Sequence, residues 1–256
     1  MDKDGARRVA ISAGAGGIGL AIARRMTKAG WRVAICDVSG EALAAAASEL
    51  PGVLALRADV SDEGEVAAFF AEIERSFGGL DAMVNNAGIA GPTAGVEDIA
   101  PQDWRRCIDI GLTGQFLCTR HAVPMLKRAG GGSIVCMSSA AGKHGYAFRT
   151  PYSAAKFGVI GFAQSLAKEL GPANIRVNAI LPGIVEGPRM RSVIENRAAA
   201  TGVSVPEMEA RYLASISLRR MVTMEDVAET VYFLLSEAGR NISGQSIGVD
   251  GNVETL

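Results

Sequence analysis

Ser-Ala-Gly-Ala-Gly-Gly-Ile-Gly occupies residues 12–19, where a short apolar run at residues 9–13 gives way to helical periodicity over residues 17–29. Glycines at such a strand-to-helix turn let backbone N–H groups approach a phosphate at the helix N-terminus, where the helix dipole favours negative charge. A tight turn followed by a helix cap would use the same residues. The interpretation as a dinucleotide loop therefore depends on the surrounding sequence.

An acidic residue ends the next predicted strand, residues 32–37. Asp37 lies 18 residues after Gly19, close to the spacing at which a carboxylate binds the ribose hydroxyls of NAD and repels the 2′-phosphate of NADP. Asp59 and Val60 close the third predicted strand, where a carboxylate could accept a hydrogen bond from an adenine amino group. Either strand end alone is also ordinary turn chemistry. We expect NAD as the cofactor.

Strand-like and helix-like patterns alternate along the whole chain. Helical segments separate seven predicted strands, at residues 9–13, 32–37, 53–58, 80–85, 133–138, 175–181 and 245–249. Continuous apolar strands of this kind predict one α/β domain over residues 1–256, with a doubly wound parallel sheet covered by helices on both faces. Residues 184–220 are less regular, rich in charge and long enough for two short helices. We expect this segment to be a lid over the substrate.

The composition excludes several classes of protein. The chain has 256 residues, of which 48% are hydrophobic and 21% are charged, and this argues against disorder. Lysine and arginine number 26 against 27 acidic residues, so the basic excess of a nucleic-acid-binding protein is absent. The two histidines, His121 and His144, form no ligand cluster, so we expect no catalytic metal.

The sequence favours a cytoplasmic location. Arg7 and Arg8 precede an apolar run as in a signal peptide, but Asp2 and Asp4 acidify the segment and glycines interrupt the run. No continuous apolar stretch of about 18 residues is present, so no membrane span is expected. The cysteines show no paired spacing and are expected to be buried, reduced thiols: Cys36, Cys107, Cys118 and Cys136.

A group of candidate catalytic residues follows the fifth predicted strand. Ser139 lies just past that strand, and Tyr152 and Lys156 are four residues apart on the next helix, which places them on one helical face. A phenol is a poor base at neutral pH, because its pKa is about 10. A nearby ammonium group lowers that pKa, so Tyr152 could exchange a proton with a substrate oxygen that Ser139 holds.

With these motifs the chain resembles the short-chain dehydrogenase/reductase family. The matching segments are residues 17–19, 85–88, 138–139, 152–156, Asn178, 182–183 and 244–251. The resemblance implies a Rossmann-type sheet of seven parallel strands, NAD(P)-dependent oxidoreduction of a hydroxyl or carbonyl group, and a homotetramer or homodimer. By this resemblance, Tyr152 is the acid/base, Ser139 orients substrate, and Lys156 binds the nicotinamide ribose and tunes Tyr152.

The resemblance also implies a set of cofactor contacts. They are Ser12, Gly14, Gly16, Gly17, Ile18, Gly19, Asp37, Asp59, Val60, Asn86, Ala87, Gly88, Tyr152, Lys156, Pro182, Gly183 and Ile184.

Three positions depart from the family pattern. Ala13 stands where glycine is usual, which we expect to be tolerable only with a negative φ. Gly111 replaces an asparagine thought to help a backbone carbonyl hold a water near the catalytic lysine, and we expect Gly111→Asn to leave an active enzyme. Gly187 replaces a threonine that often bonds the carboxamide, so the backbone near Ile184 could hold that group instead.

Several arginines border the expected substrate site. Arg149 lies in the loop before Tyr152, and the lid carries Arg189, Arg191, Arg197, Arg211, Arg219 and Arg220. An inward-facing arginine would bind a carboxylate bidentately, although a solvated surface is the alternative for any one of them. We expect Arg149 and Arg189, with Ser139, to contact the substrate.

The expected activity is NAD-dependent interconversion of a secondary alcohol and a ketone, on a small polar or anionic substrate such as a deoxy sugar acid. Two alternatives remain open. One is a 3-oxoacyl-(acyl-carrier-protein) reductase, and the other is a catalytically silent dinucleotide sensor.

Overall fold

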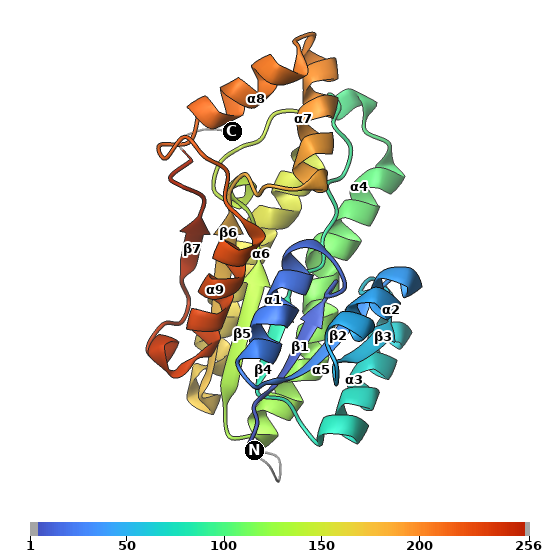
Figure 1. Ribbon diagram of the computed structural model, residues 1–256, viewed down its shortest axis with the longest axis vertical. Coiled ribbons are helices and arrows are strands. Elements are labelled where there is room, and N and C mark those ends of the chain that lie inside the picture. Colours follow the sequence, from blue (N-terminus) through green and yellow to red (C-terminus); the bar gives the residue numbers. More distant parts are fainter. Residues whose placement is uncertain (1–4, 254–256) are drawn as a thin grey trace.

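The computed structural model describes residues 5–253, so Asp2 and Asp4 lie outside the described residues. The chain forms a seven-stranded parallel sheet, as the sequence predicts, and the strand order is β3-β2-β1-β4-β5-β6-β7 (Figure 1). The strands are β1 (Arg8–Ser12), β2 (Arg32–Asp37), β3 (Leu54–Arg57), β4 (Ala82–Asn85), β5 (Gly132–Met137), β6 (Ile175–Pro182) and β7 (Ser246–Val249).

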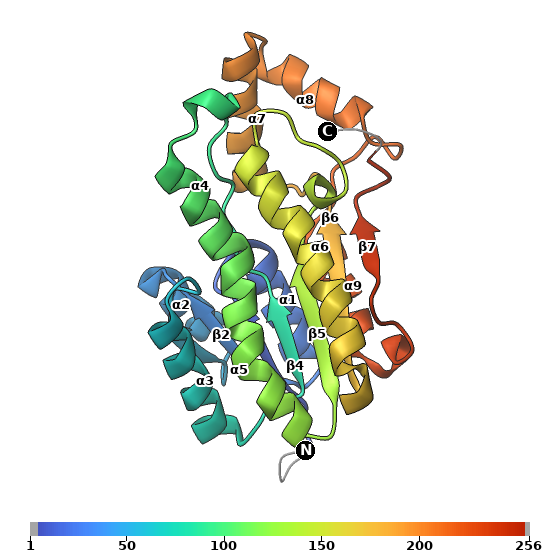
Figure 2. The same cartoon turned by 180° about the vertical axis from the view of Figure 1, so that it is seen from behind.

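Helices cover both faces of the sheet, because the strands carry apolar side chains on both sides. One face packs against α1 (Gly17–Lys28), α2 (Gly40–Glu49) and α9 (Met224–Leu235), which lie in front in Figure 1. The other face, in front in Figure 2, is covered by α3 (Glu63–Phe77), α5 (Gly114–Arg128) and α6 (Thr150–Leu170). The helix α4 (Pro101–Ile108) precedes α5 and packs against α6.

Short helical turns complete the chain. A π-helical turn, η2 (Asp109–Thr113), joins α4 and α5, so the two helices predicted at 101–109 and 112–128 run on as one column (Figure 2). The 3₁₀ turns are η1 (Val96–Asp98), η3 (Ala140–Gly142), η4 (Gly171–Ala173) and η5 (Glu237–Gly239).

The segment predicted to be a lid forms two helices, α7 (Pro188–Thr201) and α8 (Val205–Ala214). They stand above the carboxyl ends of the strands (Figure 1). Ile194, Met208, Tyr212 and Ile216 give this segment an apolar cluster of its own, separate from the two cores that flank the sheet.

The order of the strands fixes the place for a ligand. β1 pairs with β2 on one side and with β4 on the other, so the chain direction across the sheet reverses at β1. In open α/β sheets a ligand binds beyond the carboxyl ends of the strands at such a switch point.

A buried ion pair ties the amino end of β1 to the turn before β4. Arg8 Nε and Nη2 lie 2.8 and 3.0 Å from the two carboxylate oxygens of Asp81, and the Arg8 backbone N–H donates to the same carboxylate. The carboxylate raises the pKa of Arg8. The pKa of Asp81 is lowered, because hydrogen bonds and charge from Arg8 outweigh the effect of burial.

Cys36, Cys107, Cys118 and Cys136 are buried free thiols, as predicted. None of the helices in the described part of the chain has the length and apolar character needed to span a bilayer.

Candidate active site

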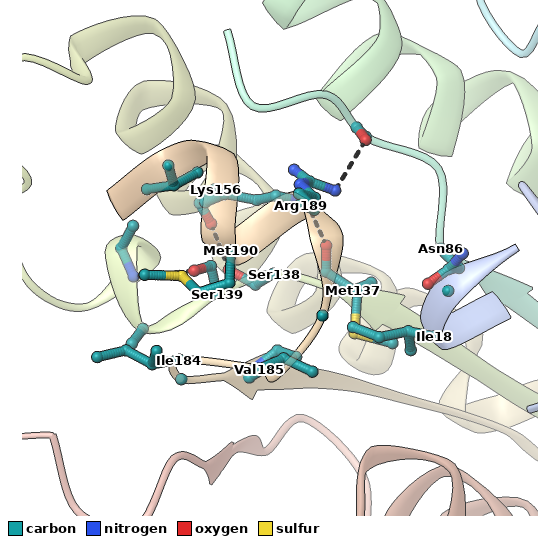
Figure 3. Close-up of a pocket in the computed structure, with 18 of the residues that line it drawn as sticks. Ile18, Asn86, Met137, Ser138, Ser139, Lys156, Ile184, Val185, Arg189 and Met190 are labelled. Atoms are coloured by element: carbon teal, nitrogen blue, oxygen red, sulfur yellow. Dashed lines mark hydrogen bonds between the residues drawn. The ribbon is translucent and has the colours of Figure 1, made fainter. Parts of the chain in front are cut away.

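One large cavity opens at the carboxyl ends of β1, β4, β5 and β6, beneath α7. Most of the predicted site residues line it: Gly16, Gly17, Ile18, Asp37, Asn86, Gly88, Ser139, Arg149, Tyr152, Lys156, Pro182, Gly183, Ile184 and Arg189. Figure 3 shows how side chains from β5, α6 and α7 converge on it.

Other predicted residues stand behind the cavity wall and hold the loops in place. The Ser12 hydroxyl accepts hydrogen bonds from the backbone N–H groups of Asn86 and Ala87, at 3.0 and 3.1 Å. The Asn86 amide donates back to the carbonyl oxygens of Ser12 and Ala13. These bonds fix the glycine loop after β1 against the loop after β4.

The four predicted loop glycines divide into two kinds. A Cβ on Gly14 would lie 2.6 Å from Ile35, and one on Gly19 would collide with the Ala13 carbonyl, so these two allow close packing of the protein. A Cβ on Gly16 or Gly17 would meet no protein atom and would project into open space beside the cavity. Gly16 and Gly17 therefore leave a cradle at the N-terminus of α1, which fits a dinucleotide pyrophosphate.

The expectation of a negative φ at Ala13 is wrong. Ala13 has φ of 49°, in the left-handed region that favours glycine. The Asn86 side-chain amide, in the loop after the neighbouring strand β4, donates a hydrogen bond of 3.0 Å to the Ala13 carbonyl and so holds this strained backbone in place.

Replacing Ala13 by glycine is expected to stabilise the protein. The left-handed conformation costs an L-residue roughly 1–2 kcal/mol, and the greater freedom of glycine in the unfolded chain cancels about 0.5–1 kcal/mol of the relief. Ala13→Gly should therefore raise the free energy of unfolding by about 0.5–1 kcal/mol in denaturant titration. Ala10→Gly, inside β1, should lower it, and a destabilised Ala13→Gly would contradict the assignment.

Asp37 ends β2 at the rim of the cavity. Its carboxylate accepts from the backbone N–H groups of Ala15 and Ser39, at 3.3 and 3.2 Å, so it is held beside the glycine loop. Asp59 and Val60 do not line the cavity. The Asp59 carboxylate is turned to the Ser61 hydroxyl and N–H, and Val60 is buried against Gly114, so their contact with adenine stays a prediction.

Ser139, Tyr152 and Lys156 come together at the far end of the cavity. The N-terminal turn of η3 places Ser139, and the first two turns of α6 place the other two residues. Lys156 is buried, and its ammonium group donates to the Met137 carbonyl at 2.8 Å (Figure 3). The same ammonium lies 5.7 Å from the centroid of the Tyr152 ring.

Residues 13–253 match the family described as Enoyl-(Acyl carrier protein) reductase. The chain belongs to the short-chain dehydrogenase/reductase family. Its relatives include the cis-4-hydroxycyclohexanecarboxylate dehydrogenase of Sinomonas cyclohexanicum, 39% identical over 250 residues, with 96% of each chain covered. The 2-dehydro-3-deoxy-L-rhamnonate dehydrogenase (NAD(+)) of Sphingomonas sp. (strain SKA58) is 36% identical over 228 residues, covering 89% of this chain and 87% of the relative.

Solved structures agree with this assignment. A variant of actinorhodin polyketide ketoreductase with NADPH superposes with a TM-score of 0.94 and 32% identity, over all of both chains. This short-chain dehydrogenase/reductase is accordingly an oxidoreductase with a Rossmann-type fold, and its structural neighbours include complexes with NADPH and with NAD+.

The electrostatics of this short-chain dehydrogenase/reductase favour an ionisable Tyr152. Burial alone would raise the pKa of its phenol, but the charges of Lys156, Arg189 and Arg149 and a hydrogen bond from Ser139 bring the pKa below its ordinary value. The pKa of Lys156 is also lowered, first by burial and then by Arg189. A lowered phenol pKa is what a tyrosine base needs near neutral pH.

Two arginines reach the same end of the cavity. Arg149 is only 3% exposed; its guanidinium lies 5.0 Å from the Tyr152 ring centroid and donates to the Ala90 carbonyl. Arg189 donates to the Gly88 carbonyl at 3.2 Å (Figure 3). Within residues 5–253 no carboxylate lies within ion-pair distance of either, and the buried Arg149 Nε has no partner there.

Sequence reasoning missed several residues of the cavity wall. Tyr146 lines the cavity, and its hydroxyl hydrogen-bonds the hydroxyl of Tyr212 from α8, while the Arg197 guanidinium lies 4.8 Å from the Tyr146 ring centroid. These contacts join residues that lie far apart in the sequence, so no local sequence pattern indicates them. Met190, Val193 and Met224 add apolar wall, and the helical periodicity of the lid is the one signal that could have indicated the first two.

Gly187, where the family often has threonine, lines the cavity at the start of α7 with φ of 144°. A Cβ there would lie 2.7 Å from Met224 Cε. Side chains that could hold a metal ion, three or more together, are not found among residues 5–253.

Proposed function

We propose that the protein is an NAD-dependent dehydrogenase that interconverts a secondary alcohol and a ketone, with Tyr152 as the acid/base. The observation that carries the proposal is one cavity with a dinucleotide cradle at Gly16 and Gly17 and, at its other end, Ser139, Tyr152 and Lys156. A silent sensor would not need a tyrosine whose pKa is lowered by surrounding cations.

In oxidation, the Tyr152 phenolate accepts the proton of the substrate hydroxyl. Ser139 donates a hydrogen bond to the same oxygen and fixes its position. Lys156 stabilises the phenolate by its charge and has donors left for ribose hydroxyls. The nicotinamide, when bound, supplies the hydride acceptor. In reduction, Tyr152 returns the proton to the alkoxide oxygen.

Asp37 supports NAD as the preferred dinucleotide, because its carboxylate stands at the cavity rim where a 2′-phosphate would be repelled. We expect kcat/KM to favour NAD over NADP by tenfold or more, and Asp37→Ala to reduce that ratio by about tenfold, or about 1.4 kcal/mol. Glu41→Gln, an exposed charge in the first turn of α2, is the control and should keep the ratio. A wild-type preference for NADP would refute the role of Asp37.

The substrate is proposed to be a small hydroxy acid or sugar acid anion. Arg149 and Arg189 present positive charge beside Tyr152 without a carboxylate partner among the described residues, and an anionic substrate would compensate that charge. The names of the Sinomonas and Sphingomonas relatives also describe dehydrogenases acting on carboxylates.

A comparison of acids with their methyl esters tests this substrate class. A charge-assisted hydrogen bond contributes about 1.5–3 kcal/mol, so we expect kcat/KM for the free acid to exceed that for the ester by about 10–100-fold. Arg189→Gln should remove most of the difference by raising KM for the acid alone. Equal rates for acid and ester in the wild type would contradict an anion subsite.

A 3-oxoacyl reductase is the second candidate, favoured by the description of the matching family and by the ketoreductase structure. Steady-state reduction of an acetoacetyl thioester, measured beside oxidation of sugar acids, separates the two candidates. The dehydrogenase proposal expects the sugar acids to be used with the higher kcat/KM.

A homotetramer in the cytoplasm completes the proposal. Phe116 on α5 and Phe157 on α6 are each 47% exposed, and Trp104 on α4 is 41% exposed. These three helices lie in front in Figure 2. Apolar side chains grouped on these helices suit association of two copies of the chain. The buried free cysteines suit a reducing compartment.

A further inference from the structure

The position of the missing asparagine, Gly111, lies in the π-helical turn between α4 and α5. Gly111 is buried and contributes a carbonyl but no side chain. One turn further along, in the first turn of α5, stands Gln115, whose side chain is 1% exposed. Burying a side-chain amide lowers the stability of the folded protein unless its polar atoms form hydrogen bonds.

The Gln115 amide bridges two backbone carbonyls. Nε2 donates to the Gly111 carbonyl at 3.3 Å and to the Met137 carbonyl at 3.1 Å. Both partners are acceptors, so the amide nitrogen must face them and the orientation of the amide is fixed. Gln115 Oε1 is buried and has no partner among the described residues. An apolar side chain of similar size would avoid that cost, so the two donated bonds account for the glutamine.

The Met137 carbonyl links this amide to the catalytic lysine. It accepts from Gln115 Nε2 and from Lys156 Nζ, at 2.8 Å, and so both of its lone pairs are used (Figure 3 shows the lysine bond). Because the Gln115 amide fixes the Met137 carbonyl, the Lys156 ammonium bonded to that carbonyl is kept on the side that faces the Tyr152 ring. Gln115 itself does not line the cavity.

We propose that Gln115 is a positioning residue for Lys156: its amide, bridging the Gly111 and Met137 carbonyls, takes the place of the asparagine that this chain lacks. This inference rests on the proposed function of Lys156 and Tyr152. An amide N–H that donates to two carbonyls does not relay protons, so Gln115 acts through geometry and not as a catalytic residue.

The consequence concerns the acidity of Tyr152. Among the surrounding groups, Lys156 has the largest share in lowering the pKa of the phenol. Without the Gln115 bond, the Met137 carbonyl and the ammonium that it holds can move away from the ring. Tyr152 should then ionise at a higher pH.

The test is a spectrophotometric titration of the Tyr152 phenol without substrate. The chain has four tyrosines, and the difference spectrum against Tyr152→Phe isolates this one. For Gln115→Met, we expect the midpoint of the Tyr152 titration to rise by about one pH unit and the midpoint of the kcat–pH profile for oxidation to rise with it. At neutral pH this shift corresponds to about tenfold lower kcat. Because the titration needs no substrate, it still decides the role of Gln115 if the proposed activity is not found.

Three further variants keep the result interpretable. Thr119→Val removes another buried hydrogen bond of α5, from Asn85 to the Thr119 hydroxyl, and should leave the Tyr152 midpoint unchanged. Gly111→Asn added to Gln115→Met should reverse part of the shift and bring the Tyr152 midpoint back toward the wild-type value. A Cβ at Gly111 would lie 3.3 Å from Ala155 Cβ, so a small adjustment admits it. If Gln115→Met does not fold, Gln115→Asn, which keeps the amide but shortens its reach, is titrated instead and should show the same direction of shift.

A wild-type Tyr152 midpoint and kcat profile in folded Gln115→Met or Gln115→Asn would overturn the inference. An equal shift in Thr119→Val would overturn it as well, because loss of any buried bond in α5 would then have the same effect.

Discussion

Tyr152→Phe is expected to lower kcat by about 10²–10⁴-fold, the usual contribution of general acid/base catalysis, while the affinity for NAD stays within about twofold. The phenylalanine keeps the ring that packs near Lys156 and Arg149, and removes only the hydroxyl that exchanges the proton. Turnover is measured as NADH formation and affinity by calorimetric titration with NAD. A variant that keeps wild-type turnover would contradict the role of Tyr152 and would favour a different base or a sensor.

The pH dependence of the wild type belongs to the same prediction. Oxidation requires the deprotonated phenol, and the pKa of Tyr152 is lowered by Lys156, Arg189, Ser139 and Arg149 against the effect of burial. The rate of oxidation should therefore rise with pH and level off below the ordinary tyrosine pKa of about 10. Arg149→Met removes one of the lowering charges and should move the midpoint to higher pH.

Asp81→Leu is expected to lower the free energy of unfolding by about 3–5 kcal/mol, because it leaves the buried Arg8 guanidinium without its carboxylate. Denaturant titration at neutral pH measures the change. The double variant Arg8→Met/Asp81→Leu should recover much of the loss, since no unpaired charge remains buried. Glu49→Gln, which breaks an exposed pair with Arg24, is the control and should have little effect.

The sign of the pH dependence follows from the lowered pKa of Asp81. The pair contributes its full stability above the ordinary carboxyl pKa of about 4, and the contribution is lost as the pH falls through the lower, folded-state value. An Asp81→Leu protein that unfolds at the wild-type denaturant concentration would show that the pair contributes nothing.

The fold could be predicted because each strand and helix carries its own periodicity, and because the glycine loop stands at a strand-to-helix turn. β2, for example, spans Arg32–Asp37 as expected from its apolar run. The boundaries of α4 and α5 were less predictable. The π-helical turn Asp109–Thr113 joins them, and the sequence of that turn reads like an ordinary helix.

The site was predictable where a residue's position along a strand or helix determines its direction. Tyr152 and Lys156 lie on one face of α6 by their spacing, and the structure brings both to the cavity. Contacts between distant segments escaped sequence reasoning. Ala13, which has a positive φ, accepts a hydrogen bond from the Asn86 amide, 73 residues away, and the contact of Tyr146 with Tyr212 spans 66 residues.

Asp59 illustrates a local limit of prediction from sequence. Its place at a strand end suggests an adenine contact, which stays a prediction, while in the structure its carboxylate accepts hydrogen bonds from the hydroxyl and N–H of Ser61, two residues on. Such an Asx-type turn competes with ligand binding for the same oxygen atoms, and the sequence alone does not show which arrangement forms.

Hydride transfer itself is the most direct test of the central claim. The wild-type protein is incubated with NAD and a panel of hydroxy acids and sugar acids that carry deuterium on the carbinol carbon, and the NADH formed is analysed by mass spectrometry. We expect at least one acid to yield NADH carrying one deuterium, and Tyr152→Phe to form it more slowly by about 10²–10⁴-fold. No deuterated NADH from any acid in the panel, or equal formation by Tyr152→Phe, would contradict the central claim.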